Sequence, residues 1–155
     1  NLALEYFEHI KKTDLTLKNI KFDDWFENTF KKYESGTPNF EAHHVIPADL
    51  LVKNEELKEL LFELHKADPN FKFDFNGGDN GIMLQKKSKT FENNGHTSHK
   101  QYNDAVSEKI TNIINNAPSK EKAFERIQKF INDSKEKLKK EVLLGDKDVN
   151  DIVNF

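Results

Sequence analysis

The sequence contains no cysteine among its 155 residues. Disulfide bonds and thiolate metal sites are therefore excluded, and the metal ligands that remain are His, Asp, Glu and Asn side chains. No apolar run approaches the roughly 20 residues that a helix needs to cross a bilayer. The chain begins without Met and shows no signal peptide, so we expect it to be part of a longer protein.

Apolar residues are also scarce, because hydrophobic side chains make up 35% of the chain and charged ones 33%. Such a balance is typical of disorder when the apolar residues are scattered. Here they recur at helical spacing, as in Leu57, Leu60 and Leu64, and thirteen Phe are present. The sequence therefore predicts one ordered domain over residues 1–155, with a small core rich in aromatic side chains.

The net charge is −3, whereas nucleic-acid-binding domains usually carry an excess of positive charge. The charges are unevenly distributed, however. Residues 41–79 hold nine acidic and four basic side chains, and residues 119–140 hold eight basic and four acidic ones. A basic face can bind a phosphate backbone while an acidic face meets a different partner. Taken by itself, the Lys-rich last helix fits a solvated surface better than a nucleic-acid-binding one.

The spacing of apolar residues predicts an α+β domain that is mainly helical. We expect helices over residues 2–10, 22–33, 54–66, 99–117 and 119–138, with Asn54 and Ser119 as N-caps. We expect strands over residues 40–46, 71–75 and 82–84, with a turn before the last one. The polar stretch 86–98 has no periodicity, which predicts an exposed loop.

The side chains that can do chemistry concentrate in three places: a strand with His43 and His44, a turn with Asp79 and Asn80, and a helix start with His96 and His99. Because side chains alternate along a strand, the two adjacent histidines point to opposite sides. One can bind a metal ion while the other, with an unperturbed imidazole pKa of about 6.5, acts as a general base. The two histidines at the helix start are three residues apart, so one ion can reach both rings.

The number of imidazoles also bears on the identity of the metal. Three imidazoles without a thiolate suit Zn, Ni or Co, and fewer imidazoles with carbonyl or water ligands shift the preference toward Mg or Mn. The residues alone therefore predict a strand, a hairpin and a helix arranged around one divalent ion.

Three segments, in this order, resemble the AHH group of nuclease domains. They are EAHHVIPADLL at Glu41–Leu51, DFNGGDNGIML at Asp74–Leu84 and GHTSHKQYNDAV at Gly95–Val106. The resemblance covers residues 40–106. The group belongs to the HNH and endonuclease VII superfamily, so it implies a small ββα-metal (His-Me finger) core over about residues 40–116, with helical additions at 1–35 and 119–155.

The resemblance also implies a role for individual residues. His43 matches a metal ligand, and His44 matches the general base. Asn80 matches the Asn that orients the base histidine through a hydrogen bond. His99 matches the helix histidine that completes the metal site, and His96 is a further candidate ligand, although many relatives place this histidine one residue earlier.

The implied reaction is hydrolysis of phosphodiester bonds, in DNA rather than RNA, by an endonuclease with one divalent metal ion (Mg, Mn, Zn or Ni). Four lysines flank the site and are expected to contact the substrate backbone: Lys86, Lys87, Lys89 and Lys100. Members of the group often form the C-terminal toxin domain of secreted bacterial proteins. That implies a delivered toxin fragment that acts in the target-cell cytoplasm and is inhibited by a cognate immunity protein.

Two other functions remain open at this point. The first is a ribonuclease on the same scaffold, because metal-and-histidine chemistry does not by itself distinguish the sugar. The second is a non-catalytic binding module whose histidines hold a structural metal, for which a closed site of four ligands would argue.

Overall fold

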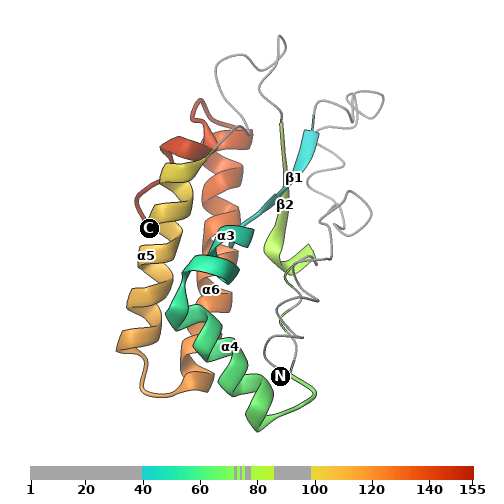
Figure 1. Ribbon diagram of the computed structural model, residues 1–155. Helices are drawn as coiled ribbons and strands as arrows, with labels where there is room; N and C mark the ends of the chain where they lie inside the picture. The colour runs from blue at the N-terminus through green and yellow to red at the C-terminus, as the bar shows by residue number, and fades with distance from the viewer. Residues whose placement is uncertain (1–39, 72, 74, 76–77, 86–98) are drawn as a thin grey trace.

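The computed structural model describes residues 40–71, 73, 75, 78–85 and 99–155. It is mainly helical with one small antiparallel sheet, which confirms the predicted α+β class. The described elements are, in order, β1 (Phe40–His44), α3 (Ala48–Lys53), α4 (Glu55–Ala67), the 3₁₀ turn η2 (Gly78–Asn80), β2 (Gly81–Gln85), α5 (Lys100–Asn116), α6 (Lys120–Leu138), the π-helical η3 (Lys139–Leu143) and the 3₁₀ turn η4 (Val149–Asp151). Figure 1 labels most of these elements.

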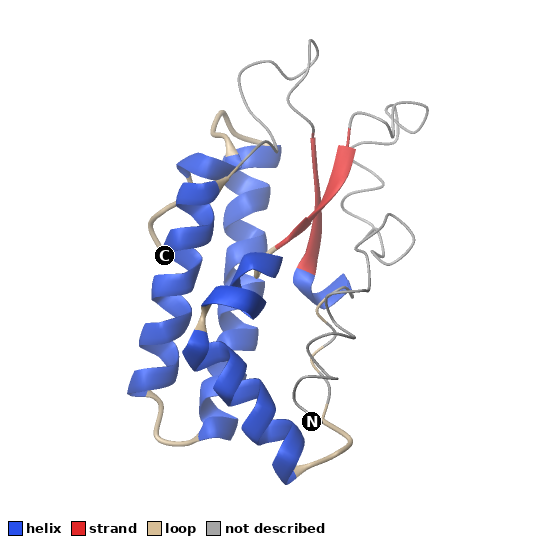
Figure 2. Cartoon of the chain, viewed as in Figure 1, coloured by secondary structure: helices blue, strands red, loops and turns tan. Residues whose placement is uncertain are grey.

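The helices pack together in a bundle, and the two strands lie beside it (Figure 2). Within the bundle α4, α5 and α6 all contact one another. The strands β1 and β2 pair in antiparallel register, with His43 opposite Ile82 and His44 opposite Gly81. The strand β2 packs against η3, whose Val142 and Leu143 are buried. The chain directly after α6 therefore supports the paired strands β1 and β2, called the hairpin below.

The helices α4 and α6 begin at the side chains that the sequence predicts as N-caps. Asn54 Oδ1 accepts a hydrogen bond from the amide of Leu57 at 2.9 Å, and Ser119 Oγ accepts one from the amide of Lys122 at 3.1 Å. Each cap satisfies one of the amides that a helix start leaves unpaired. Asn54 is also buried, and its Nδ2 donates to Ser107 Oγ on α5, so this cap also ties α4 to α5.

The helix α5 is capped by a residue far along the chain. His99 occupies the N-cap position, but its side chain makes no capping hydrogen bond to the first backbone amides of the helix. Asn150 Oδ1, from η4, accepts instead from the amides of Gln101 and Tyr102, at 2.8 and 3.3 Å. The C-terminal segment thereby holds the start of α5, where His99 lies.

The prediction of a strand over residues 71–75 is wrong for the residues described in this range. Phe71 and Phe73 lie in irregular chain, and Phe75 lies in a turn. Phe73 and Phe75 are buried, and the rings of Phe71 and Phe73 lie 4.9 and 6.0 Å from that of Phe124 on α6. Alternating aromatic residues can thus fill a core without a strand, because ring burial needs no neighbouring strand. The short helix α3 was not expected from the sequence.

Several other expectations lie outside the described residues: the helices at 2–10 and 22–33 and the loop at 86–98. Within the part of the chain that the structure describes, no helix is long and apolar enough to cross a membrane.

Candidate active site

The strand β1 places the two neighbouring histidines in different surroundings. The side chain of His43 is buried, with 1% of its surface exposed. Its ring lies edge-on to that of His99 from α5, with 5.0 Å between the centroids and 81° between the planes. His44 is partly exposed, and its ring stacks on that of Phe75 at 4.3 Å and 13°. One histidine therefore faces the helix, and the other lies near the surface against a buried aromatic ring.

His99 is oriented from its own helix. Its Nδ1 lies 2.7 Å from Asn103 Oδ1, one turn further along α5. An amide oxygen only accepts, so Nδ1 carries the proton in this pair and Nε2 is the nitrogen that would bind a metal ion. Asn103, to which the sequence assigned no role, thus contacts a predicted site residue. Its signal was the spacing His99-x-x-x-Asn103, which puts both side chains on one helix face.

Tyr102 lies behind the histidines and links α5 to the hairpin. Its ring centroid is 5.0 Å from that of His43 and 5.6 Å from that of His99. Its hydroxyl donates a 2.6 Å hydrogen bond to the carbonyl of Val45. Burial raises the pKa of Tyr102 well above its ordinary value, so the phenol stays neutral and keeps its proton for this bond.

Asn80 holds the chain that follows His44. Its Oδ1 accepts from the amide of Ile46 at 2.9 Å, and its Nδ2 donates to the carbonyls of Ile46 and Phe75 at 3.2 and 3.0 Å. Its own carbonyl accepts from the amide of Val45 at 2.8 Å. Together with the bond from the tyrosine hydroxyl, all four backbone polar groups of residues 45 and 46 are satisfied.

These contacts differ from the hydrogen bond that we expected between Asn80 and the ring of His44. Among the described residues, both donor positions and the oxygen of the Asn80 amide are engaged by backbone groups. The Asn80 amide therefore bonds to the backbone beside His44 and not to its ring. It fixes the backbone after the histidine and the carbonyl of Phe75, whose ring stacks on the imidazole.

The other predicted site residues contribute less to the described geometry. Lys100 is exposed and pairs with Asp104 at 2.7 Å, and the hydrogen bond to this carboxylate raises the pKa of Lys100. Asp79 is exposed in η2. Four predicted residues lie outside the described part of the chain: His96, Lys86, Lys87 and Lys89.

Two of the predicted metal ligands, His43 and His99, lie among the described residues, so their arrangement can be compared with that of a metal site. No group of three or more His, Asp or Glu side chains within these residues is arranged to hold a metal ion. His43 and His99 nevertheless approach edge-on from a strand and a helix. Two rings with centroids 5.0 Å apart are close enough to share one ion that lies about 2.0–2.1 Å from one nitrogen of each. The pair therefore fits half of a tetrahedral site, and further ligands would come from elsewhere in the chain or from solvent.

Comparison with protein-family models gives a match that covers most of the chain. The model of a nuclease family of the HNH/ENDO VII superfamily, with conserved AHH, matches residues 25–141, about three-quarters of the chain. The matched range includes Ala42, His43 and His44, which spell this motif, and extends beyond Asn80 and His99. Neither the curated proteins nor the solved structures contain a match to the chain.

Proposed function

We propose that this chain, which belongs to the AHH nuclease family of the HNH/endonuclease VII superfamily, is a metal-dependent endonuclease that hydrolyses phosphodiester bonds of DNA. The observation that carries the proposal is the position of the two histidines of β1. The buried His43 meets His99 from α5, while His44 lies near the surface on Phe75. A metal ligand and a base thus come from adjacent positions of one strand, β1.

In this proposal each residue of the site has one task. His44 takes a proton from the attacking water, and Phe75 and Asn80 hold its ring and its backbone in place. His43 and His99 would hold one divalent ion (Mg, Mn, Zn or Ni), and Asn103 fixes the tautomer of His99. A bound ion supplies positive charge that stabilises the phosphate and the departing oxygen. A histidine base makes a second ion unnecessary for activating water.

The arrangement supports catalysis better than a purely structural metal site. A closed structural site takes four protein ligands. Two described imidazoles converge here, and a third histidine lies near the surface outside their contact. A purely structural metal site does not require a further histidine, such as His44, that lies near the surface on an aromatic ring.

The experiment that tests the proposal compares the parent with two single-histidine variants on plasmid DNA and on total RNA, with each of the four metals. We expect His44→Ala to lower the cleavage rate by about 10²–10⁴-fold, the range for loss of a general base. His65→Ala is the matched control, because His65 lies on α4 and its Nδ1 contacts the carbonyl of Phe71, away from the hairpin. Equal cutting by His44→Ala and the parent would refute the role of this histidine.

The choice of substrate is decided by the same experiment. We propose DNA as the substrate, and cleavage of RNA alone would replace this with a ribonuclease. Absence of cutting with every metal and both nucleic acids would favour a metal-stabilised binding module.

We further infer that the chain is a bacterial toxin domain that acts in the cytoplasm of a target cell and is neutralised by an immunity protein. Its membership of the nuclease family supports this, since cutting nucleic acid is harmful to a host cell. The test is induced expression in a bacterial host without any partner. Loss of viability with the parent and survival with His44→Ala would agree with the proposal, and normal growth with both, at equal protein levels, would contradict it.

A further inference from the structure

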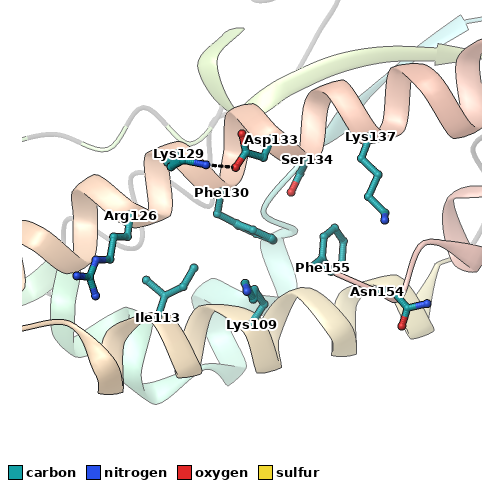
Figure 3. Close-up of a pocket in the computed structure, with 10 residues that line it drawn as sticks. All are labelled: Lys109, Ile113, Arg126, Lys129, Phe130, Asp133, Ser134, Lys137, Asn154 and Phe155. Carbon is teal, nitrogen blue, oxygen red and sulfur yellow. Dashed lines mark hydrogen bonds and ion pairs between the residues drawn. The ribbon is translucent and has the colours of Figure 1, made fainter.

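A pocket lies between α5, α6 and the C-terminal segment, apart from the histidines (Figure 3). Its volume is about 350 Å³, which falls within the range of sites for small ligands. Phe130, Phe155 and Ile113 supply its apolar surface. The ring of Phe155 lies 5.2 Å from that of Phe130 and 5.9 Å from that of Tyr102, so one side of the pocket packs on a residue of the candidate active site.

A buried hydroxyl is aimed into this pocket. Ser134 is 2% exposed, and its Oγ has no hydrogen-bond partner among the described residues. Figure 3 shows this oxygen pointing from α6 toward the space beside the two Phe rings. A buried hydroxyl without a partner costs stability, so its presence in a well-packed helix face suits a ligand that hydrogen-bonds to it. The neutral amide of Asn154 also lines the pocket.

Four basic side chains and one acidic one surround the opening: Lys109, Arg126, Lys129, Lys137 and Asp133. Lys129 pairs with Asp133, whereas Lys137 shares the carboxylate of Glu141 with Lys147 and is therefore neutralised only in part. Lys109 and Arg126 form no ion pair with any residue that the structure describes, and the guanidinium of Arg126 makes only a 3.4 Å hydrogen bond to the carbonyl of Asn116. The two uncompensated cations come from different helices and line the same pocket.

We propose that this pocket binds a backbone phosphate of the nucleic-acid substrate, outside the cleavage site. The proposal rests on the nuclease function proposed above. Lys109 and Arg126 neutralise the phosphate, Ser134 donates a hydrogen bond to it, and the adjoining sugar or base packs on Phe130 and Phe155. Phosphate contacts of this kind combine basic side chains with neutral hydroxyl and amide donors.

The extent of the basic row favours a regular polyanion over an isolated carboxylate. Arg126 and Lys137 are eleven residues apart on α6, a distance of about 16 Å along a helix. That distance corresponds to about five nucleotide steps of a duplex. Lys109 is nine residues beyond Lys100, about 14 Å along α5 from the histidine end of that helix. A nucleic-acid strand that reaches from the histidine end of α5 to Lys109 must therefore span about four nucleotide steps.

The test measures binding of fluorescein-labelled duplex DNA by anisotropy, in chelator and in a His44→Ala background so that nothing is cut. On the proposal, Lys109→Ala with Arg126→Ala removes one phosphate contact, so the slope of log affinity against log salt becomes shallower by about 0.9. The matched control is Lys120→Ala with Lys122→Ala. It also removes two cations, but these pair with Glu63 and Glu125 outside the pocket. An equal change in both double variants, or no change in either, would overturn the proposal.

A second variant separates the pocket from its charged opening. Ser134→Ala keeps every charge and removes a buried hydroxyl that lacks a partner, so we expect no loss of thermal stability. Affinity for DNA should fall about threefold to tenfold, the value of one hydrogen bond. Unchanged affinity would mean that the ligand does not enter the pocket. Equally tight binding of polyglutamate would mean that the site selects charge and not phosphate, which also refutes the proposal.

The outcomes for this pocket and for the nuclease proposal can be told apart. If the parent cuts DNA but the pocket variants bind DNA as tightly as the His44→Ala protein without further changes, the nuclease proposal is supported and the phosphate subsite is refuted. If the parent cuts neither DNA nor RNA while binding still depends on Lys109, Arg126 and Ser134, the subsite stands and the nuclease proposal falls.

Discussion

Replacing Asn80 with Ala should destabilise the whole domain, because the Asn80 amide holds backbone groups that no other side chain reaches in the described structure. The side chain is fully buried and makes three hydrogen bonds, one to the amide of Ile46 and two to the carbonyls of Ile46 and Phe75. Both partner residues belong to the core. The perturbation therefore acts on the chain immediately after the catalytic candidate His44.

The magnitude follows from these three bonds. At about 1 kcal/mol of net stabilisation for each, their loss costs about 3 kcal/mol. The substitution also leaves these three buried backbone groups without their partner, and each can then cost about 1–3 kcal/mol in place of that ~1 kcal/mol, so the total lies between about 3 and 9 kcal/mol. A domain is commonly stable by about 5–15 kcal/mol, so a loss of this size threatens folding.

The assay is equilibrium unfolding in urea, followed by circular dichroism. Asn116→Ala is the matched control, because Asn116 makes a single 2.8 Å bond to the carbonyl of Asn112 on the exposed end of α5. We expect it to change the free energy of unfolding by less than about 0.5 kcal/mol. Asn80→Asp should be at least as harmful as Asn80→Ala at neutral pH, because a carboxylate oxygen would face two carbonyls. Acid should narrow this gap as the carboxylate becomes protonated.

The reasoning would be refuted by an Asn80→Ala variant that is as stable as Asn116→Ala but has lost nuclease activity. Such a result would mean that Asn80 acts on the His44 ring itself during the reaction and not through the backbone. Loss of stability with partial activity in the folded fraction agrees with the backbone role.

Three further predictions concern the surroundings of the site. Tyr102→Phe removes the 2.6 Å bond to the carbonyl of Val45 and should cost about 1–3 kcal/mol in urea unfolding; a neutral effect would show that this carbonyl finds another partner. Asn103→Ala should weaken metal binding about 10–100-fold by calorimetry while leaving the fold intact, because Asn103 orients His99; unchanged affinity would exclude His99 as the oriented ligand. The hydrogen bond from Lys147 lowers the pKa of Glu141, so its stabilisation is present at neutral pH and is lost as the pH falls through the folded-state pKa. Glu141→Gln should therefore cost less than about 1 kcal/mol at pH 7, because the pair is solvent-exposed, and the difference should vanish in acid; a constant difference at all pH values would contradict the charge effect.

The parts of the fold that the sequence predicts well depend on neighbouring residues. Asn54 and Ser119 cap helices that begin at the next residue, and the apolar spacing within α4 and α6 places Leu57, Leu61 and Ile127 in the core as expected. The pairing of β1 with β2 is not among these parts, because two helices separate the strands in the sequence and the turn rich in Gly and Asn lies directly before β2 alone. Local hydrogen bonds and apolar periodicity depend on residues that are close in the sequence, so they can be recognised before the fold is known.

The parts that sequence reasoning misses depend on contacts across the chain. Asn150 caps α5 from 48 and 49 residues away, and nothing near α5 in the sequence indicates this. Phe71, Phe73 and Phe75 alternate as a strand would, yet in the described structure their burial is decided by α6 and the hairpin. Similarly, residue type identifies Asn80 as a candidate, but its targets became visible only when the turn was placed against residues 45 and 46.

The candidate site depends on one short piece of backbone that connects its two halves. Val45 and Ile46 follow the histidine pair directly, and their polar groups bond to Asn80 from the turn and to Tyr102 from α5. The same Tyr102 ring packs on His43 and His99, so movement of α5 relative to the hairpin would break the Val45 bond and separate the two imidazoles together. Because η4 holds the first turn of α5 through Asn150, the distance between the imidazoles also depends on the C-terminal segment. Positioning of the proposed metal ligands is therefore a property of the assembled domain and not of the hairpin alone.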